Sequence, residues 1–298
     1  MYSILDAFTV INVIGLVIVF SEYTLSEEEI DKTQIVLLTF YIVNLCLIPF
    51  PSMYAFGSER RFMGIFYSCN LSVSVMTLCG VAIWEIEKYK YKKPRLKVLL
   101  LNLIGFGILI VATRTRTVLF LLPYWLWECS QIFNKKYFIW TLILLGLTIS
   151  PALFNSLNER MSLEGGDASS MTRALLYLAL IKGILGNYII IPHGSNAAFF
   201  FIKQFTGDDG FSAHNDVLRY LYDWGGYFII FLIYLIRTMR KYCVFNFEMI
   251  LIFLGFSALL LHNMLFLPIT WIPLCLIMNI RELRFPVKKY RHGEKGIC

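Results

Sequence analysis

The sequence predicts an all-α polytopic integral membrane protein with about nine transmembrane helices and one large loop on the outer face. Of its 298 residues 58% are hydrophobic and 16% charged, whereas a soluble domain carries roughly a quarter charged residues. The mean hydropathy is +0.65, and runs such as 35–50 and 98–112 are almost uninterrupted apolar stretches. This composition excludes a soluble enzyme, a disordered chain, a disulfide-stapled secreted domain and a nucleic-acid-binding module.

Nine apolar segments are candidate spans, and together they divide the chain into four regions. Six helices are expected in residues 1–153, a large outer loop with short helices in 154–222, three further helices in 223–280, and a basic tail in 281–298. The predicted spans are 4–20, 35–50, 65–84, 98–112, 117–132, 137–153, 223–236, 246–261 and 264–280. The first of them lacks the basic start of a cleavable signal.

Lysine and arginine set the expected orientation, because short cytoplasmic loops are enriched in both. The basic block 88–97, the cluster 237–241 and the tail 281–295 fall on one side under strict alternation, and this side is predicted to be cytoplasmic. The segment 21–34 falls there too, although it is acidic, since acidic residues bear little on orientation. The amino terminus is then outside. An odd number of spans with an external amino terminus is unusual, and it indicates a missed span or a shortened amino-terminal end.

The net charge of +7 and the seven cysteines do not predict other partners. The basic residues lie in short loops between apolar segments, as in a membrane protein, so no nucleic acid is expected. The cysteine count is odd and no C-x-x-C pair occurs, so neither a disulfide framework nor a zinc site is indicated. Asp208 and Asp209 are adjacent, which turns their side chains in different directions. We therefore expect no metal site and no cofactor.

The outer stretch 154–222 is long enough to predict a functional role. Capping residues in 167–172 precede an apolar helix that begins near Arg173 and is expected to lie on or dip into the membrane. Residues 192–196 and 207–210 are predicted turns. Residues 212–216 are predicted to cap the helix that leads into the seventh span.

The arginines on the outer face are the most informative residues, because the positive-inside rule predicts few of them there. The guanidinium group stays charged and binds phosphate through two parallel hydrogen bonds; binding to lipid headgroups or a loop salt bridge is the alternative reading. Arg114 and Arg116 are the strongest candidates, since an unpaired charge between two apolar segments is costly. The full set is Arg60, Arg61, Arg114, Arg116, Arg160 and Arg173.

His214 is the second candidate for chemistry, because an imidazole at the outer mouth of a helix can accept a proton near neutral pH. The alternative is that His214 caps the start of that helix. His193 lies in a predicted turn with no partner that the sequence identifies, His262 is predicted to lie in a turn between spans, and His292 to lie in the solvated tail. No Walker A, H-E-x-x-H or G-x-S-x-G motif occurs.

Four weak motifs occur in an order that resembles the O-antigen polymerase and O-antigen ligase superfamily. Residues 61–70 (RFMGIFYSCN) are similar to its Arg-x-x-Gly-x-Phe…Asn element, and residues 113–119 (TRTRTVL) to its Ser-x-Ser-Arg element. Arg173 with 192–196 (PHGSN) resembles the Arg…Pro-x-x-Gly stretch of the large periplasmic loop. Residues 214–226, with His-Asn-x-x-Leu and a later glycine pair, resemble the element that follows.

The resemblance implies a GT-C-like glycosyltransferase of the bacterial inner membrane, with its active site facing the periplasm or cell exterior. Such an enzyme polymerises undecaprenyl-pyrophosphate-linked repeat units into the O-antigen of lipopolysaccharide, capsule or exopolysaccharide, without metal. The implied partners are that lipid-linked oligosaccharide, membrane lipids, a chain-length regulator and a flippase.

The resemblance also assigns roles to individual residues. Arg114 or Arg116, with Arg173, would hold the donor pyrophosphate, whose developing charge fixed guanidinium groups stabilise. His214 would be the base or hydrogen-bond partner of the acceptor hydroxyl. The remaining predicted substrate-binding residues are Asn215, which would orient the acceptor, and Arg61, Asn70, Arg160 and Gly194.

Three alternative functions stay open from the sequence. An O-antigen ligase would use the same donor site to move finished glycan onto lipid A-core or protein. A transporter or flippase of lipid-linked sugars would favour charges at mid-membrane and repeated, broken helices, which are not visible in this sequence. A membrane acyltransferase would need a catalytic histidine on the side where its acyl donor binds.

Overall fold

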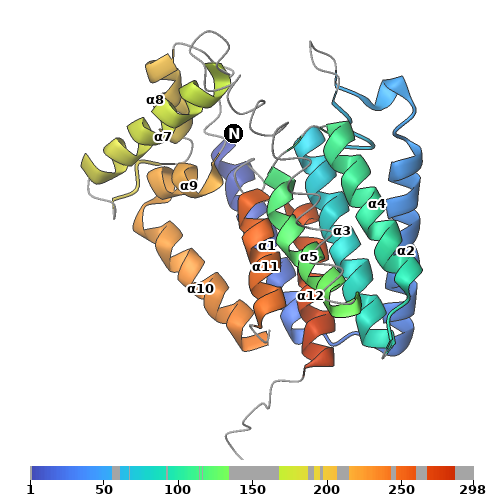
Figure 1. Cartoon of the computed structure of the whole chain (residues 1–298). Helices are drawn as coiled ribbons and strands as arrows, with labels where there is room; N and C mark the ends of the chain where they lie inside the picture. The colour runs from blue at the N-terminus through green and yellow to red at the C-terminus, as the bar shows by residue number, and fades with distance from the viewer. Residues whose placement is uncertain are drawn as a thin grey trace, which may run out of the picture. The chain divides into compact units, whose positions relative to one another are not determined.

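The computed structural model of the chain is all-α in the part that it describes (Figure 1). The described residues are 2–55, 61–66, 68–91, 93–113, 115, 117–133, 168–186, 191–194, 197–206, 215–242, 246–259 and 267–285. Within these ranges the only extended pairing is an isolated bridge between Tyr54 and Phe62. The predicted all-α class is therefore confirmed.

Most helices coincide with predicted spans. The helices are α1 Tyr2–Glu22, α2 Glu27–Cys46, η1 Pro51–Met53, α3 Cys69–Lys90, α4 Leu96–Thr113, η2 Thr117–Leu121, α5 Leu122–Ile132, α7 Ala168–Gly186, α8 Ala197–Thr206, α9 Asp216–Trp224, α10 Gly226–Tyr242, α11 Phe247–Leu259 and α12 Pro268–Arg284. The predicted span 137–153 lies outside the described residues. In the described part of the chain two helices, α3 and α4, are long and apolar enough to cross a membrane.

Two predicted spans differ from the structure more than the others. Helix α2 begins at Glu27 rather than residue 35, because Ser26 and Glu29 form a reciprocal capping box that starts a helix within the acidic segment. The predicted span 223–236 is interrupted at Gly225, whose φ of 53° lies in the left-handed region. Two helices, α9 and α10, meet there in place of one continuous span.

The chain forms two compact units, which are described separately. The α3 unit comprises Val10–Thr115, Tyr234–Met249 and Leu267–Cys298. The α9 unit comprises Met1–Thr9, Arg116–Ile233 and Ile250–Phe266.

Helix α3 is the centre of the α3 unit and packs against α12, α4 and α2. In its apolar window 89% of residues are buried, against 33% in α4. Small residues allow the helices to approach closely, as in membrane bundles. A Cβ at Gly105 would overlap the ring of Tyr41, and one at Gly80 would lie 3.0 Å from the Asn102 Oδ1 atom.

Polar contacts fix the relative direction of these helices. At one end of the unit the Gln34 amide donates to Glu87 at 3.2 Å, and the Asn279 amide donates to the Tyr23 carbonyl at 2.5 Å. The segments that these residues join are the ones that the sequence assigns to a single membrane side. At the other end the Phe62 N–H donates to the Ala112 carbonyl at 2.9 Å. Helices α2, α3 and α4 therefore run alternately up and down.

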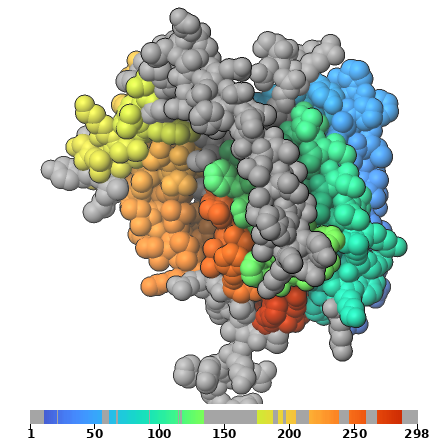
Figure 2. Space-filling view, viewed as in Figure 1, coloured from blue at the N-terminus to red at the C-terminus, as the bar shows by residue number. Residues whose placement is uncertain are grey.

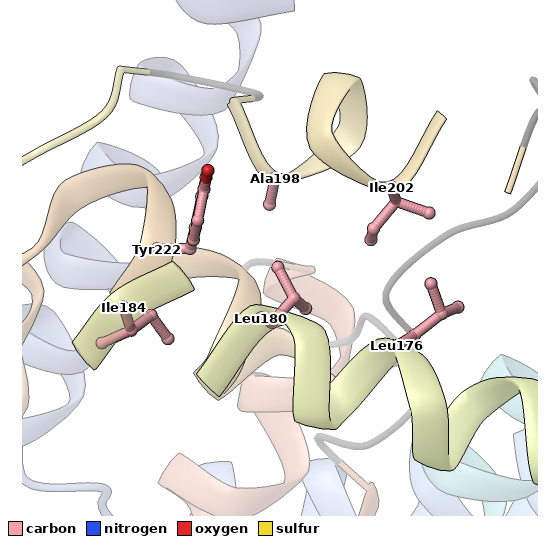
Figure 3. Packing of buried hydrophobic residues seen from close by; sticks show 6 residues of the cluster. All are labelled: Leu176, Leu180, Ile184, Ala198, Ile202 and Tyr222. Carbon is pink, nitrogen blue, oxygen red and sulfur yellow. The ribbon is translucent and has the colours of Figure 1, made fainter. Parts of the chain in front are cut away.

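Helices α7, α8 and α9 form the described core of the α9 unit (Figure 3). Side chains from all three helices meet in one cluster, which comprises Leu176, Leu180, Ile184, Ala198, Ile202 and Tyr222. In Figure 3 Leu176, Leu180 and Ile184 follow one another along α7, on the side of this helix where Ala198, Ile202 and Tyr222 lie. The apolar helix predicted near Arg173 is α7, but it begins at Ala168. The prediction that residues 168–172 cap this helix is therefore wrong, because they lie within its first two turns. The buried face of α7 contributes Leu176, Leu180 and Ile184 to the cluster with α8 and α9.

Candidate functional site

The structure describes Arg61, Asn70, Gly194 and Asn215 among the predicted site residues. The backbone of Arg173 lies in the second turn of α7. Arg114, Arg116, Arg160 and His214 lie outside the described residues. Arg61 and Asn70 belong to the α3 unit, and Gly194 and Asn215 to the α9 unit.

Arg61, Thr115 and Asn70 form a hydrogen-bonded chain in the α3 unit, which we call the Arg61 network. The Arg61 Nε donates to the Thr113 carbonyl at 2.9 Å, and its Nη2 donates to the Thr115 hydroxyl at 3.2 Å. The Thr115 hydroxyl in turn donates to the Asn70 Oδ1 at 3.2 Å. Residues from two motifs that are about 50 positions apart in the sequence, 61–70 and 113–119, are thereby brought together.

A sharp turn after Arg61 holds this arrangement in place. Phe62 is fully buried and packs edge-on against the Tyr54 ring at 5.6 Å. Gly64 follows with a φ of 60°, and a Cβ there would lie 2.9 Å from the Asn44 Oδ1 atom. Only glycine satisfies both the backbone angle and the space, so the turn depends on it.

The guanidinium group of Arg61 donates hydrogen bonds to neutral groups. Its two described hydrogen-bond partners are a carbonyl and a hydroxyl, and no carboxylate in the described part of the chain pairs with it. Helix α3 begins at Cys69, close in sequence, and its N-cap residue Ser68 makes no side-chain capping bond. A helix start carries a partial positive charge and unpaired N–H groups. The guanidinium charge of Arg61 and the start of α3 therefore both favour the binding of an anion.

Asn215 and Gly194 lie near opposite ends of α9. The Asn215 Oδ1 accepts the Leu218 N–H at 3.1 Å and caps the first turn. The Gly194 N–H donates to the Asp223 carbonyl in the last turn at 3.0 Å, about 12 Å away along the helix axis. The prediction that 212–216 cap a helix is confirmed. Within that segment Asn215 is the N-cap of α9; His214 lies outside the described residues, so its alternative reading as a capping residue stays a prediction.

The turn that contains Gly194 positions a histidine that sequence reasoning passed over. The His193 Nδ1 lies 2.9 Å from the Tyr222 carbonyl oxygen. Its ring stacks on the Tyr222 ring, with centroids 4.3 Å apart and planes 15° apart. Burial raises the pKa of Tyr222, and the neighbouring Asp223 carboxylate adds to this effect. Tyr222 therefore stays neutral beside His193.

A second missed feature is a buried ion cluster at the other end of the α3 unit from the Arg61 network. Arg281 of α12 is fully buried; its Nη1 lies 3.0 Å from Glu85 of α3 and 2.7 Å from Glu248. Lys88 contacts the same two carboxylates at 2.9 and 3.3 Å. Isolated charges in otherwise apolar helices are the sequence signal for such a cluster. Since each carboxylate already has two cationic partners, we interpret the cluster as structural.

Comparison with models of protein families, with curated proteins and with solved structures found no match to this chain.

Proposed function

We propose that the chain is a polytopic membrane glycosyltransferase that polymerises undecaprenyl-pyrophosphate-linked oligosaccharide repeat units on the outer face of the bacterial inner membrane. The observation that carries the proposal is the Arg61 network, in which neutral partners hold a half-buried guanidinium. A guanidinium that lacks a carboxylate partner within the described ranges is suited to bind an oxyanion. A diphosphate is the oxyanion of such a donor.

Membrane embedding is supported by the apolar side chains that α4 presents outward. Val111 is 77% exposed and Ile104 60%, and the side chains of α4 form part of the visible surface in Figure 2. Leu100 and Ile108 are exposed on the same helix. A continuous apolar stripe of this kind is unfavourable in water and favourable against lipid chains.

The proposed reaction is a single displacement at the anomeric carbon of the donor sugar, which inverts the configuration of that carbon. The acceptor hydroxyl oxygen forms the new glycosidic bond, while the bond from the anomeric carbon to the pyrophosphate oxygen breaks. The hydroxyl proton goes to a base, for which His214 is our candidate, and undecaprenyl pyrophosphate leaves as the anion. Arg61 would stabilise its developing charge, and the resemblance implies the same role for Arg114 or Arg116, with Arg173, so that no divalent metal is required.

The test uses the purified full chain in lipid nanodiscs with EDTA and undecaprenyl-pyrophosphate-linked repeat units from the parent strain. We expect a ladder of polymer on a gel. Replacing Arg61→Ala should slow its formation about 100-fold or more, as for other lost charge-stabilising donors, and Arg61→Lys should recover part of the rate. Arg237→Ala, at an exposed arginine of α10, is the control and should leave the rate unchanged.

Other products would overturn the proposal in distinguishable ways. Transfer onto a lipid A-core acceptor without a ladder would assign the chain to the ligases. Movement of the lipid-linked substrate across the bilayer of proteoliposomes, without any glycosidic bond formed, would assign it to the transporters. A ladder that Arg61→Ala leaves unchanged would remove Arg61 from the donor site.

A further inference from the structure

His193 lies in the described residues 191–194, which precede α8 in the chain. Its side chain is half-buried, and its Nδ1 faces the Tyr222 carbonyl oxygen at 2.9 Å. A carbonyl oxygen can only accept a hydrogen bond, so Nδ1 carries the proton. With Nδ1 as the donor of this tautomer, the ring lone pair is on Nε2, and this nitrogen is a hydrogen-bond acceptor.

The surroundings of His193 hold the ring in a single orientation. One ring face is stacked on Tyr222, which itself contacts the Phe201 ring at 5.3 Å. The next residue, Gly194, is tied to the Asp223 carbonyl at 3.0 Å. The buried Asp223 carboxylate accepts the Ala198 N–H at 2.7 Å and thereby fixes the start of α8. An imidazole fixed in this way loses little rotamer freedom when it binds a ligand.

The Nε2 atom is the remaining polar atom of the ring. None of the described residues hydrogen-bonds to it, and Nε2 is on the opposite side of the ring from the Tyr222 carbonyl. The carboxylate of Asp223, whose backbone carbonyl accepts the Gly194 N–H, has its Oδ2 3.9 Å from the Arg219 Nε. Histidines that bind a ligand through one ring nitrogen commonly donate a hydrogen bond from the other nitrogen to a backbone carbonyl. His193 has this arrangement, with Nδ1 on the Tyr222 carbonyl and Nε2 left for a ligand.

We propose that the Nε2 atom of His193 accepts a hydrogen bond from a hydroxyl of the acceptor sugar, and that residues 191–194 with α9 form part of an acceptor subsite. This inference rests on the proposed function, and it assigns a second histidine to that reaction in addition to His214. A sugar hydroxyl is the expected ligand because it donates to a neutral imidazole without requiring charge. His193 is then a substrate-binding residue, and Tyr222 and Asp223 are its positioning residues.

The test uses two variants of His193 that distinguish the contribution of Nδ1 from that of Nε2. His193→Asn keeps a donor near the position of Nδ1, which preserves the bond to the Tyr222 carbonyl, and it removes Nε2. His193→Gln keeps an acceptor near the position of Nε2. The acceptor probe is the repeat-unit oligosaccharide as an alkyl glycoside, which can accept a glycosyl group and, lacking pyrophosphate, cannot donate one.

We expect His193→Asn to raise the KM for the alkyl glycoside about 3- to 10-fold, as for one lost hydrogen bond, with the KM for the lipid-linked donor unchanged. His193→Gln should recover part of the affinity. An unchanged acceptor KM in His193→Asn would overturn the inference and leave His193 with a structural role, while the proposed function would stand.

A second measurement does not depend on activity. The ring signals of His193 are followed by NMR in the full chain as the alkyl glycoside is added, with His292→Gln as a background that simplifies the spectrum. If the wild-type chain forms no polymer but the His193 signals shift, the sugar subsite stands and the polymerase proposal fails. If neither the signals nor the acceptor KM respond, the subsite is excluded.

Discussion

The α3 unit and the α9 unit bury their polar groups in different ways. In the α3 unit the fully buried Arg281 pairs with Glu85, a residue 196 positions away in the chain. In the α9 unit the buried Asp223 carboxylate accepts a backbone N–H from Ala198, only 25 positions away. The first arrangement joins helices that are distant in sequence, whereas the second fixes the start of one short helix.

The difference indicates what each arrangement contributes. A buried ion pair that loses one partner leaves an uncompensated charge, so the whole α3 unit depends on both partners. A capped helix start contributes to local order and costs less when it is removed. We therefore expect substitutions in the α3 unit to lower global stability, and those in the α9 unit to loosen the turn that carries His193 while the fold persists.

The largest effect is expected at Arg281. Replacing Arg281→Leu should lower the free energy of unfolding by about 3–5 kcal/mol, because Glu85 and Glu248 would lose a shared buried cation. The measurement is thermal unfolding in detergent micelles. The control Arg284→Leu removes a partly exposed arginine of the same helix whose distance to Glu85 is 3.8 Å, and it should cost less than about 1 kcal/mol. Equal losses in the two variants would contradict the comparison.

The next largest effect tests close packing in the α3 unit. Gly105→Ala should destabilise the chain by about 1–3 kcal/mol, since the new Cβ would overlap the Tyr41 ring. Gly107 is one half-turn further along α4 and has no heavy atom within 4 Å of an added Cβ. Gly107→Ala should therefore be neutral or slightly stabilising, because alanine is the better helix former. A similar melting temperature for both variants would show that Tyr41 can move aside.

A smaller and local effect is expected at Asp223 of the α9 unit. Asp223→Ala removes the acceptor of the Ala198 N–H, and loss of such a cap costs about 1 kcal/mol. Hydrogen exchange should quicken at the amides of α8 while α3 keeps its protection. Asp223→Asn keeps an oxygen acceptor, so its exchange rates at α8 should lie between those of the unaltered chain and those of Asp223→Ala. If protection were lost equally in α3, the local character of this bond would be disproved.

The sequence predicted the helices whose apolar runs are long, because the hydrophobic pattern alone defines them. The ends of helices α3, α4 and α12 lie within six residues of the ends of the spans 65–84, 98–112 and 264–280. The start of α2 was missed because its first turn is acidic and is set by the Ser26–Glu29 capping box. The break at Gly225 was missed because an apolar window does not register one residue with positive φ.

The candidate site was predictable in part. The order of the motifs placed Arg61, Asn70 and residues 113–119 in one site, and the structure brings Arg61, Thr113, Thr115 and Asn70 into hydrogen-bond contact. The contact of His193 could not be predicted, since its partner is the backbone carbonyl of Tyr222, 29 positions away. Backbone acceptors leave no residue type for a pattern to detect.

The smallest effect concerns the capping box at the start of α2, outside the predicted span 35–50. The Tyr23 hydroxyl donates to Glu29, and together with the Ser26 N–H and hydroxyl it lowers the pKa of Glu29 to about 2. A carboxyl whose pKa is lower in the folded chain contributes its stability above the ordinary value near 4.5, and this contribution is lost as the pH falls through 2. Carbon-13 NMR of the labelled carboxyl should show this midpoint, and Tyr23→Phe should raise it by removing the largest cause. A midpoint near 4.5 in the unaltered chain would mean that the capping box does not form in solution and that the first turn of α2 frays.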